Sequence, residues 1–331
     1  MSDEAQVPEP DLGEAIKETG GDTLYWCMQC GLCTGSCPWR MVPGEISEAF
    51  NERKVNRLGQ LGLEGIESED VIYACTTCGQ CLVRCPREVK VPEIIRGMRQ
   101  MLAEIGTIAP TFKPIIGSLR DQGNPWSSER AQRTDWMKGI EVPAYTEQTE
   151  YLLYVCCTSC YDARSKRIAR SLVELLKKAE VSFGVIGAEE SCCGESIRKV
   201  GAEEVFTGLA EANIKLFGER GVKKIITTSP HCLYTFKHEY PELGGEFEAI
   251  HFTQLLAQLV REGKLKPKKL AKKIAYHDPC YLGRHGDIYD DPREILQHAM
   301  DRELIELELE RADSLCCGGG GGRIWMETKA G

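Results

Sequence analysis

Residues 27–38 read CMQCGLCTGSCP, and residues 75–86 repeat the same spacing as CTTCGQCLVRCP. Both stretches follow the pattern C-x2-C-x2-C-x3-C-P, which is typical of [4Fe–4S] sites. In this pattern three closely spaced thiolates bind one cluster, and the fourth cysteine, followed by proline, binds the other cluster. The two runs therefore predict a two-cluster, ferredoxin-like domain in which each run serves both clusters.

The crossed arrangement assigns four cysteines to each cluster. The first set is Cys27, Cys30, Cys33 and Cys85, and the second set is Cys75, Cys78, Cys81 and Cys37. Because distant parts of the chain would be joined through iron, the metal would also stabilise the fold. Zinc binds cysteine pairs at similar spacing, but two four-cysteine runs that both end in proline favour iron.

The composition is that of a soluble globular protein, with 42% hydrophobic and 27% charged residues in 331 positions. The 17 cysteines lie mostly in clusters and no secretion signal precedes them, which favours metal ligands over disulfides. We therefore expect a reducing compartment, the cytoplasm of an anaerobe. No apolar stretch approaches the roughly 20 residues that span a bilayer, so any membrane association would run through a partner. The net charge of −9 argues against nucleic acid as a partner.

Changes in the sequence pattern divide the first half of the chain. We expect a tail at 1–24, a helical domain with two [4Fe–4S] clusters at 25–108, and a linker punctuated by proline and glycine at 109–150. A helix is expected to begin near Pro43 after the first cysteine run, and another near Pro92 after the second.

Short apolar runs alternate with helical patterns after residue 150, which predicts βαβ units and a parallel sheet. The expected strands are 151–155, 181–187, 223–228 and 273–277, and the expected helices are 163–179, 196–218 and 252–262. Ligands bind at the carboxyl ends of such strands. Several of the remaining cysteines lie just past these ends.

Two vicinal pairs, Cys192-Cys193 and Cys316-Cys317, are each followed by glycine. Cys157 precedes the first pair by 35 positions, and Cys280 precedes the second by 36. The matching offsets predict an internal duplication. The expected fold is thus an α-helical two-cluster ferredoxin domain followed by an α/β domain with parallel strands. Duplicated CCG halves at 151–270 and 271–331 would build the α/β domain.

These motifs together resemble the iron–sulfur subunits of heterodisulfide reductases in which a ferredoxin-like part and a cysteine-rich part are fused. The resemblance includes the stretches SPHC (229–232), HDPCYLGR (277–284) and CCGGGGGR (316–323). The chain is similar also to the iron–sulfur subunits of glycolate and lactate oxidation and of anaerobic glycerol-3-phosphate dehydrogenase.

In that family five thiolates in the order C…CC…CxxC hold a third, non-cubane [4Fe–4S] cluster. Carried over to this chain, the resemblance implies Cys157, Cys192, Cys193 and Cys232 as ligands. Ser229 stands where the pattern has its remaining cysteine, and we expect Cys160 to supply the fifth thiolate. The alternative is that this site holds an altered cluster or none.

The second half-site would use Cys280, Cys316 and Cys317, but the sequence stops at Gly331, before a matching CxxC. Three interpretations stay open: a truncated product, completion by a partner, or an empty site. The glycines at 318–322 lack the Lys-Ser or Lys-Thr of a nucleotide loop, and we expect them to let the backbone turn tightly beside a cluster.

The resemblance implies an iron–sulfur oxidoreductase subunit of an anaerobic complex. Electrons would pass through two cubanes to the third cluster, with flavin, hydrogenase-like or cytochrome b type subunits as partners. If that cluster reduces a small disulfide, Cys193 and His231 are the candidate catalytic residues, with His231 as proton donor; a hydrogen bond to a ligand is the other role open to His231. The alternative functions are an electron-wire adaptor of a glycolate/lactate, acyl-CoA or quinone-linked oxidoreductase, and a zinc-bound structural protein.

Overall fold

The computed structural model describes residues 10–42, 50–63 and 72–327, and the chain falls into two compact units. The first unit comprises residues 1–113, 196–203 and 312–331, and the second comprises residues 114–195 and 204–311. Each unit therefore combines segments that are distant in the sequence.

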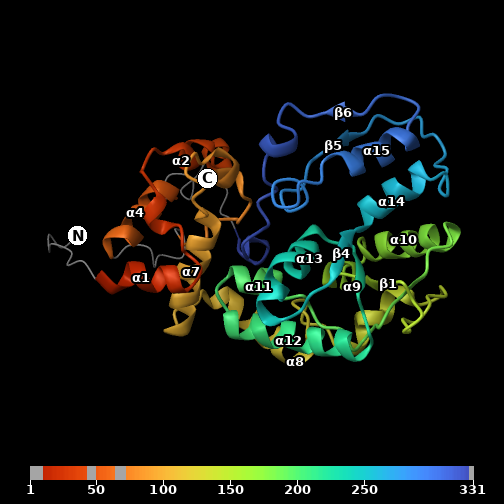
Figure 1. The fold of residues 1–331 in the computed structure, drawn as a ribbon, viewed down its shortest axis with the longest axis horizontal. Coiled ribbons are helices and arrows are strands. Elements are labelled where there is room, and N and C mark those ends of the chain that lie inside the picture. Colours follow the sequence, from red (N-terminus) through yellow and green to blue (C-terminus); the bar gives the residue numbers. More distant parts are fainter. Residues whose placement is uncertain (1–9, 43–49, 64–71, 328–331) are drawn as a thin grey trace. The chain divides into compact units, whose positions relative to one another are not determined.

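Helices are the only regular secondary structure in the described part of the first unit. The longer ones are α1 (Pro10–Glu18), α4 (Glu52–Leu61) and α7 (Val91–Glu104), and α1 packs on both others (Figure 1). Two short helices, α2 (Leu32–Ser36) and α6 (Gln80–Arg84), each begin inside a cysteine run. The short helix α11 (Glu195–Lys199), which lies almost wholly in the segment 196–203, also belongs to this unit. The 3₁₀ segments of the unit are η1 (Leu24–Trp26), η2 (Pro38–Met41), η3 (Pro110–Phe112) and η8 (Arg323–Trp325). The predicted helical, ferredoxin-like domain agrees with this architecture.

Helix α7 forms for the reasons visible in its sequence. Pro92 lies in the first turn, where its missing N–H costs no hydrogen bond, and Glu93 follows it near the positive end of the helix dipole. Ile94, Ile95 and Met98 are buried on one face. The predicted helix is confirmed here, whereas the one expected near Pro43 lies outside the described residues.

The second unit contains a four-stranded parallel sheet in the order β2-β1-β3-β4. The strands are β1 (Tyr151–Tyr154), β2 (Phe183–Gly184), β3 (Lys224–Thr227) and β4 (Glu248–His251). All three pairings are parallel, as the alternation of strands and helices predicts. A separate parallel pair joins β5 (Ala275–Tyr276) to β6 (Ile305–Glu306).

Helices cover and connect these strands (Figure 1). The longer ones are α8 (Lys113–Gln122), α10 (Lys166–Lys178), α12 (Glu203–Glu219), α14 (Phe252–Arg261) and α15 (Asp290–Ala299). The shorter segments are η4 (Arg130–Met137), α9 (Cys157–Tyr161), α13 (Pro230–Tyr234), the π-helical turn η5 (Thr235–Glu239) and η6 (Tyr240–Leu243), and η7 (Arg311–Asp313) begins at the last residue of this unit.

Two stretches differ from the sequence expectations. The stretch expected to be a linker, 109–150, contains the short helical segments α8 and η4. The single helix expected over 196–218 is split into α11 and α12. Gly201 lies between them with φ of +94°, a left-handed conformation that ends one helix before the next begins.

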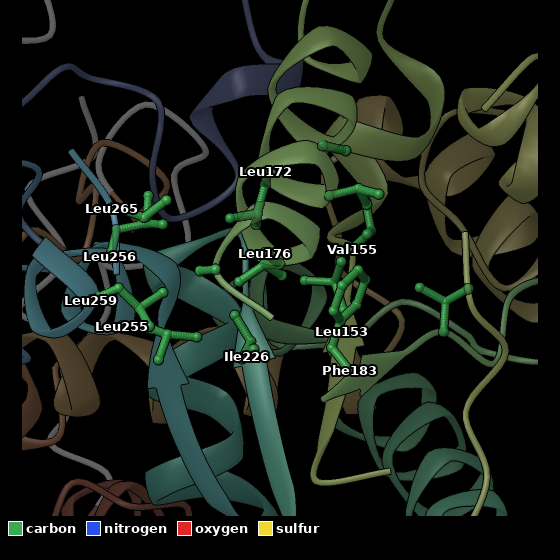
Figure 2. Close-up of a cluster of buried hydrophobic side chains, with 14 of the residues drawn as sticks. Leu153, Val155, Leu172, Leu176, Phe183, Ile226, Leu255, Leu256, Leu259 and Leu265 are labelled. Carbon is green, nitrogen blue, oxygen red and sulfur yellow. The ribbon is translucent and has the colours of Figure 1, made fainter. Parts of the chain in front are cut away.

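The core of the second unit lies between the sheet and helices α10 and α14 (Figure 2). Leu153 and Ile226 project from β1 and β3, and they meet Leu172 and Leu176 from α10. Burying such aliphatic side chains contributes about 1.5–3 kcal/mol each. The core fixes the carboxyl ends of β1 and β3, where the cysteines of this unit follow.

Candidate metal centres

The four cysteines predicted to bind the first cluster line one cavity of the first unit. Cys27, Cys30, Cys33 and Cys85 surround about 310 Å³ of empty space. Met28, Leu32, Arg53 and Arg87 are also among its lining residues. Cys30 is exposed and the other three cysteines are partly exposed. The donor set and the space therefore fit a cubane cluster close to the protein surface.

The second predicted set lines a different and much smaller cavity. Cys37, Cys75, Cys78 and Cys81 surround about 20 Å³, and all four side chains are buried. Four converging thiols are the donor set of a [4Fe–4S] cluster.

The two cysteine runs have the same backbone path. Gln29 and Thr77, each two residues after the first cysteine of a run, have positive φ angles of 61° and 53°. Gly31 and Gly79 follow with φ of 85° and 75°, and each directly precedes a short helix. In the second run, the N–H of Thr77 donates to the Cys75 thiol at 3.4 Å. Backbone N–H groups that point at sulfur are suited to stabilising a thiolate or a cluster.

Burial makes the free thiols of these sites weak acids. Desolvation raises the pKa of Cys33 to about 11 and that of Cys75 to about 12, and it raises the pKa of Cys81 well above that of a free thiol. A bound metal favours the thiolate and releases the proton. Metal loading at these sites is therefore coupled to deprotonation.

Arg99 of α7 supports the loop of the second cysteine run. Its guanidinium is fully buried and donates to the carbonyl oxygens of Ile72 and Cys75, at distances of 2.7–2.9 Å. It also donates to the carbonyl oxygens of Lys199 at 2.6 Å and Gly321 at 3.1 Å. One side chain thus joins all three segments of the first unit.

The glycine run after Cys316-Cys317 packs against the same loop. A Cβ on Gly320 would lie 2.3 Å from the carbonyl oxygen of Thr76, and one on Gly321 would lie 2.3 Å from that of Cys75. The Cys316 thiol lies 3.4 Å from the Thr76 hydroxyl. Glycine is required here because the two backbones approach too closely for a side chain. This contact matches the expectation that the run turns tightly beside a candidate cluster site.

A third group of cysteines lies at the carboxyl edge of the sheet in the second unit. Cys156 and Cys157 directly follow β1, and Cys232 lies on α13, which follows β3. Strand order changes direction between β1 and β3, and ligands of parallel sheets bind at such switch points. The vicinal pair arrives from the loop after β2. The site therefore lies where this topology places ligands.

The thiols of this third group are in mutual contact. The Cys193 and Cys232 sulfur atoms are 3.4 Å apart, and Cys157 pairs with Cys192 while Cys156 pairs with Cys232. Hydrogen bonds from neighbouring thiols lower the pKa of Cys193 to about 6 and that of Cys156 to about 5. The group brings together five cysteines, four of which the resemblance implies.

Cys160, the fifth ligand expected from the sequence, lies near Cys156 and Cys157 but has a backbone group as its hydrogen-bond partner. Its thiol donates to the carbonyl oxygen of Val155 at 3.3 Å and lies in the apolar core. It occupies the last turn of α9, whereas Cys156 precedes that helix. Cys156 is thus the additional thiol that contacts Cys232.

The first CCG loop is held by buried polar side chains. The N–H of Ser191 donates to the Asn213 side chain at 3.0 Å, and the Tyr154 hydroxyl donates to the Ser191 carbonyl oxygen at 2.6 Å. The Tyr240 hydroxyl donates to the Cys193 carbonyl oxygen at 3.2 Å. Gly194 has φ of +87°, and its missing Cβ leaves room for the Phe206 ring, which would otherwise be 2.8 Å away.

A buried ion pair contacts a cysteine of this group. Arg133 and Glu190 side chains are 2% and 3% exposed and lie 3.0 Å apart. The Arg133 guanidinium also donates to the Cys157 thiol at 3.5 Å and to the Val155 carbonyl oxygen at 3.1 Å. A positive charge is therefore fixed beside a candidate ligand.

His231 lies next to the same group. Its Nδ1 atom is 3.1 Å from a carboxylate oxygen of buried Glu195, and its ring stacks on Tyr281 with centroids 3.9 Å apart. Burial lowers the pKa of His231, but Glu195 outweighs burial and raises it to about 9. Cys280 and Cys156 contribute to this raised pKa, so both thiols lie near the ring. Cys280 belongs to the second unit, whereas Cys316 and Cys317 belong to the first.

No group of three or more His, Cys, Asp or Glu side chains in the described part of the chain has the geometry to hold a single metal ion. In a cubane each iron takes one protein thiolate, so the thiolates do not meet at one point. Of the helices that the structure describes, none is both long and apolar enough to cross a membrane.

Sequence reasoning missed the side chains that support these sites. Arg99 interrupts the apolar pattern of α7, and Arg133 lies in a polar run, so neither is marked by spacing. For Arg99 the sequence offers one signal, because a charged residue within a helix that has many buried positions suggests a buried partner. Arg133 has no such signal.

Comparison with known proteins supports the two-part organisation. Residues 23–89 match the family described as 4Fe-4S dicluster domain, and residues 151–237 and 274–331 match the family described as Cysteine-rich domain. The EtfAB:quinone oxidoreductase of Syntrophomonas wolfei subsp. wolfei is 41% identical over 72% of this chain and 35% of its own length. A Bacillus subtilis protein named "Probable iron-sulfur-binding oxidoreductase FadF" is 35% identical over 93% of this chain and 52% of its own length.

One subunit of the dihydromethanophenazine:CoB–CoM heterodisulfide reductase of Methanosarcina mazei is 28% identical over 96% of this chain and 66% of its own length. The chain thus spans between 35% and 66% of the length of these three relatives. The chain thus joins a 4Fe-4S dicluster domain to a cysteine-rich domain, and it is similar to this heterodisulfide reductase component and to iron–sulfur oxidoreductases.

Proposed function

We propose that this chain transfers electrons within a multi-subunit redox complex through two [4Fe–4S] cubanes and a third, cysteine-ligated cluster. The observation that carries the proposal is the separation of the eight ferredoxin-type cysteines into two cavities. Each cavity is lined by one of the two crossed sets, three cysteines from one run and one from the other. The clusters supply one-electron redox chemistry, and the chain supplies the thiolates, the backbone N–H groups and the burial that position them.

The third cluster would be held by Cys156, Cys157, Cys192, Cys193 and Cys232. The thiol contacts within this group and its place at the switch point of the sheet support this ligand set. Cys156 replaces Cys160 in the proposal, because the Cys160 thiol is hydrogen-bonded to Val155 in the apolar core.

The identity of the electron acceptor divides the proposal into two forms. In the first form the chain is a wire to another oxidoreductase, as favoured by its 41% identity to an EtfAB:quinone oxidoreductase and by Ser229 in place of a thiolate. In the second form the third site reduces a disulfide, with His231 donating a proton to the leaving thiolate. The ion pair with Glu195 keeps a proton on His231 near neutral pH, which supports this role.

Iron content of two cysteine variants tests the third ligand set. Anaerobically purified Cys156→Ser is expected to lose the roughly four irons of the third cluster and to keep the roughly eight of the two cubanes. Cys160→Ser is the matched control and is expected to keep all of them. Retained iron in the first variant together with lost iron in the second would refute the assignment.

Disulfide reduction distinguishes the two forms. With reduced viologen as donor, the disulfide-reductase form predicts turnover of a small disulfide that Cys193→Ala abolishes. The wire form predicts no turnover by the complete complex, even though viologen reduces the clusters. Turnover that survives in Cys193→Ala would exclude the second form.

A further inference from the structure

The two cavities of the first unit differ in their access to solvent. The thiols of the second set are all buried, whereas the first set includes exposed Cys30. Electron transfer between proteins requires a close approach of the two cofactors. Of these two cavities, the first is therefore the one where an external carrier can come nearer to a cluster.

Apolar side chains lie exposed around that cavity. Met28 and Leu32 line it and are 73% and 52% exposed, and neighbouring Trp26 is 49% exposed. Large apolar side chains gathered at one exposed place are a common sign of a protein-binding surface. Their position beside Cys30 links this apolar surface to the candidate cluster.

Basic side chains accompany the apolar ones. Arg53 and Arg87 line the same cavity and are exposed. Among the residues that the structure describes, no carboxylate lies at ion-pair distance from either guanidinium. The whole chain carries a net charge of −9, so a basic surface is a local exception. We call Met28, Leu32, Arg53 and Arg87 the rim.

We infer that the rim is the docking surface of an acidic, one-electron carrier protein that exchanges electrons with the first cluster. Complementary charge steers the two proteins together and orients them, and the apolar residues exclude water at the contact. The net negative charge of the chain repels an acidic carrier, so the carrier is expected to bind at the basic rim. In the exchange, the reduced carrier loses one electron and the oxidised first cluster gains it. The inference rests on the proposed function.

A flavodoxin, a small acidic carrier, serves as the probe. Isothermal titration calorimetry would measure its Kd for the anaerobically purified, cluster-loaded chain at low ionic strength. The double variant Arg53→Glu/Arg87→Glu is expected to raise Kd at least about fivefold, and Arg53→Lys/Arg87→Lys is expected to retain most of the affinity because charge is kept. Added salt is expected to weaken binding to the wild-type protein and to have little effect on the Glu variant.

Arg164→Glu/Arg167→Glu is the matched control, because these exposed arginines lie in the second unit, Arg164 just before α10 and Arg167 in its first turn. It is expected to leave Kd unchanged. Equal affinity of the wild-type protein and the Arg53→Glu/Arg87→Glu variant would overturn the inference, as would an equal loss in the control. Cluster absorbance of the same samples distinguishes failure of the docking inference from failure of the proposed function. If the clusters are present but binding does not depend on the rim, the docking surface is refuted. If the clusters are absent, the proposed function is refuted.

Discussion

At the residue scale, the sequence named most of the thiols but not the side chains that surround them. Fixed spacing marks cysteines, because several ligands must reach one cluster. Arg133 and Glu190 come from segments on either side of β1, and their meeting depends on tertiary packing that spacing does not record. The same holds for Cys156 and Cys160: both follow β1, and the start of α9 decides which thiol contacts Cys232 and which enters the core.

The ion pair predicts opposite shifts in the potential of the third cluster. A reduced cluster is more negative, so the Arg133 guanidinium beside Cys157 would stabilise the proposed third cluster in its reduced form and raise its reduction potential. Arg133→Gln is expected to lower the potential by about 60 mV, the one-electron equivalent of about 1.4 kcal/mol. Glu190→Gln is expected to raise it. The measurement is a redox titration followed by electron paramagnetic resonance.

Arg170→Gln is the control for this pair, because Arg170 donates to the carbonyl oxygens of Trp136 and Lys138 near the same segment. It should leave the potential unchanged. Shifts of the same sign in Arg133→Gln and Glu190→Gln would show that structural damage, and not charge, sets the potential.

Buried His251 predicts a loss of stability in acid. Burial lowers its pKa to about 3, well below the 6.5 of a free histidine, so the unfolded chain binds a proton that the folded chain refuses. This stability is present above pH 6.5 and is lost as the pH falls. Between pH 8 and pH 5.5 the unfolding free energy of the wild-type protein is expected to fall by about 1.4 kcal/mol more than that of His251→Gln. Urea unfolding at both values measures the difference.

His298→Gln, at an exposed position near the end of α15, is the control and should follow the wild-type pH dependence. If His251→Gln loses as much stability in acid as the wild-type protein does, the buried neutral histidine is not the cause.

At the element scale, the types of segment were predictable and some of their boundaries were not. The strong apolar stripe of α7 and the short apolar strands have clear periods. The break between α11 and α12 depends on Gly201, which looks like an ordinary interior glycine in the sequence. Tertiary packing requires glycine at this position, because a Cβ on residue 201 would lie 2.3 Å from the carbonyl oxygen of Arg99.

Two glycine substitutions test that explanation. Gly201→Ala meets the Arg99 backbone and requires a positive φ, so it is expected to destabilise the protein by about 1–3 kcal/mol. Gly208→Ala lies inside α12 with open space around it and is expected to stabilise by about 0.5–1 kcal/mol. Thermal unfolding followed by circular dichroism compares them. Similar effects of the two substitutions would contradict the packing argument.

At the scale of the whole molecule, the chain order of the two parts was evident from the sequence, but the composition of the compact units was not. Residues 196–203 and 312–331 belong to the first unit, although they lie beyond the start of the cysteine-rich part. Arg99 holds both segments in the unit by donating to the carbonyl oxygens of Lys199 and Gly321. A backbone carbonyl oxygen is present at every residue, so such contacts cannot be recognised from the sequence. The Cys316-Cys317 pair thereby comes to lie against the second cysteine run.

The iron and acid-labile sulfide content of the anaerobically purified chain tests the central claim most directly. The account predicts about 12 irons and a matching amount of sulfide per chain, eight in the two cubanes and four at the third site. A folded, stable protein that contains no iron, or that contains zinc bound to four thiolates, would contradict it.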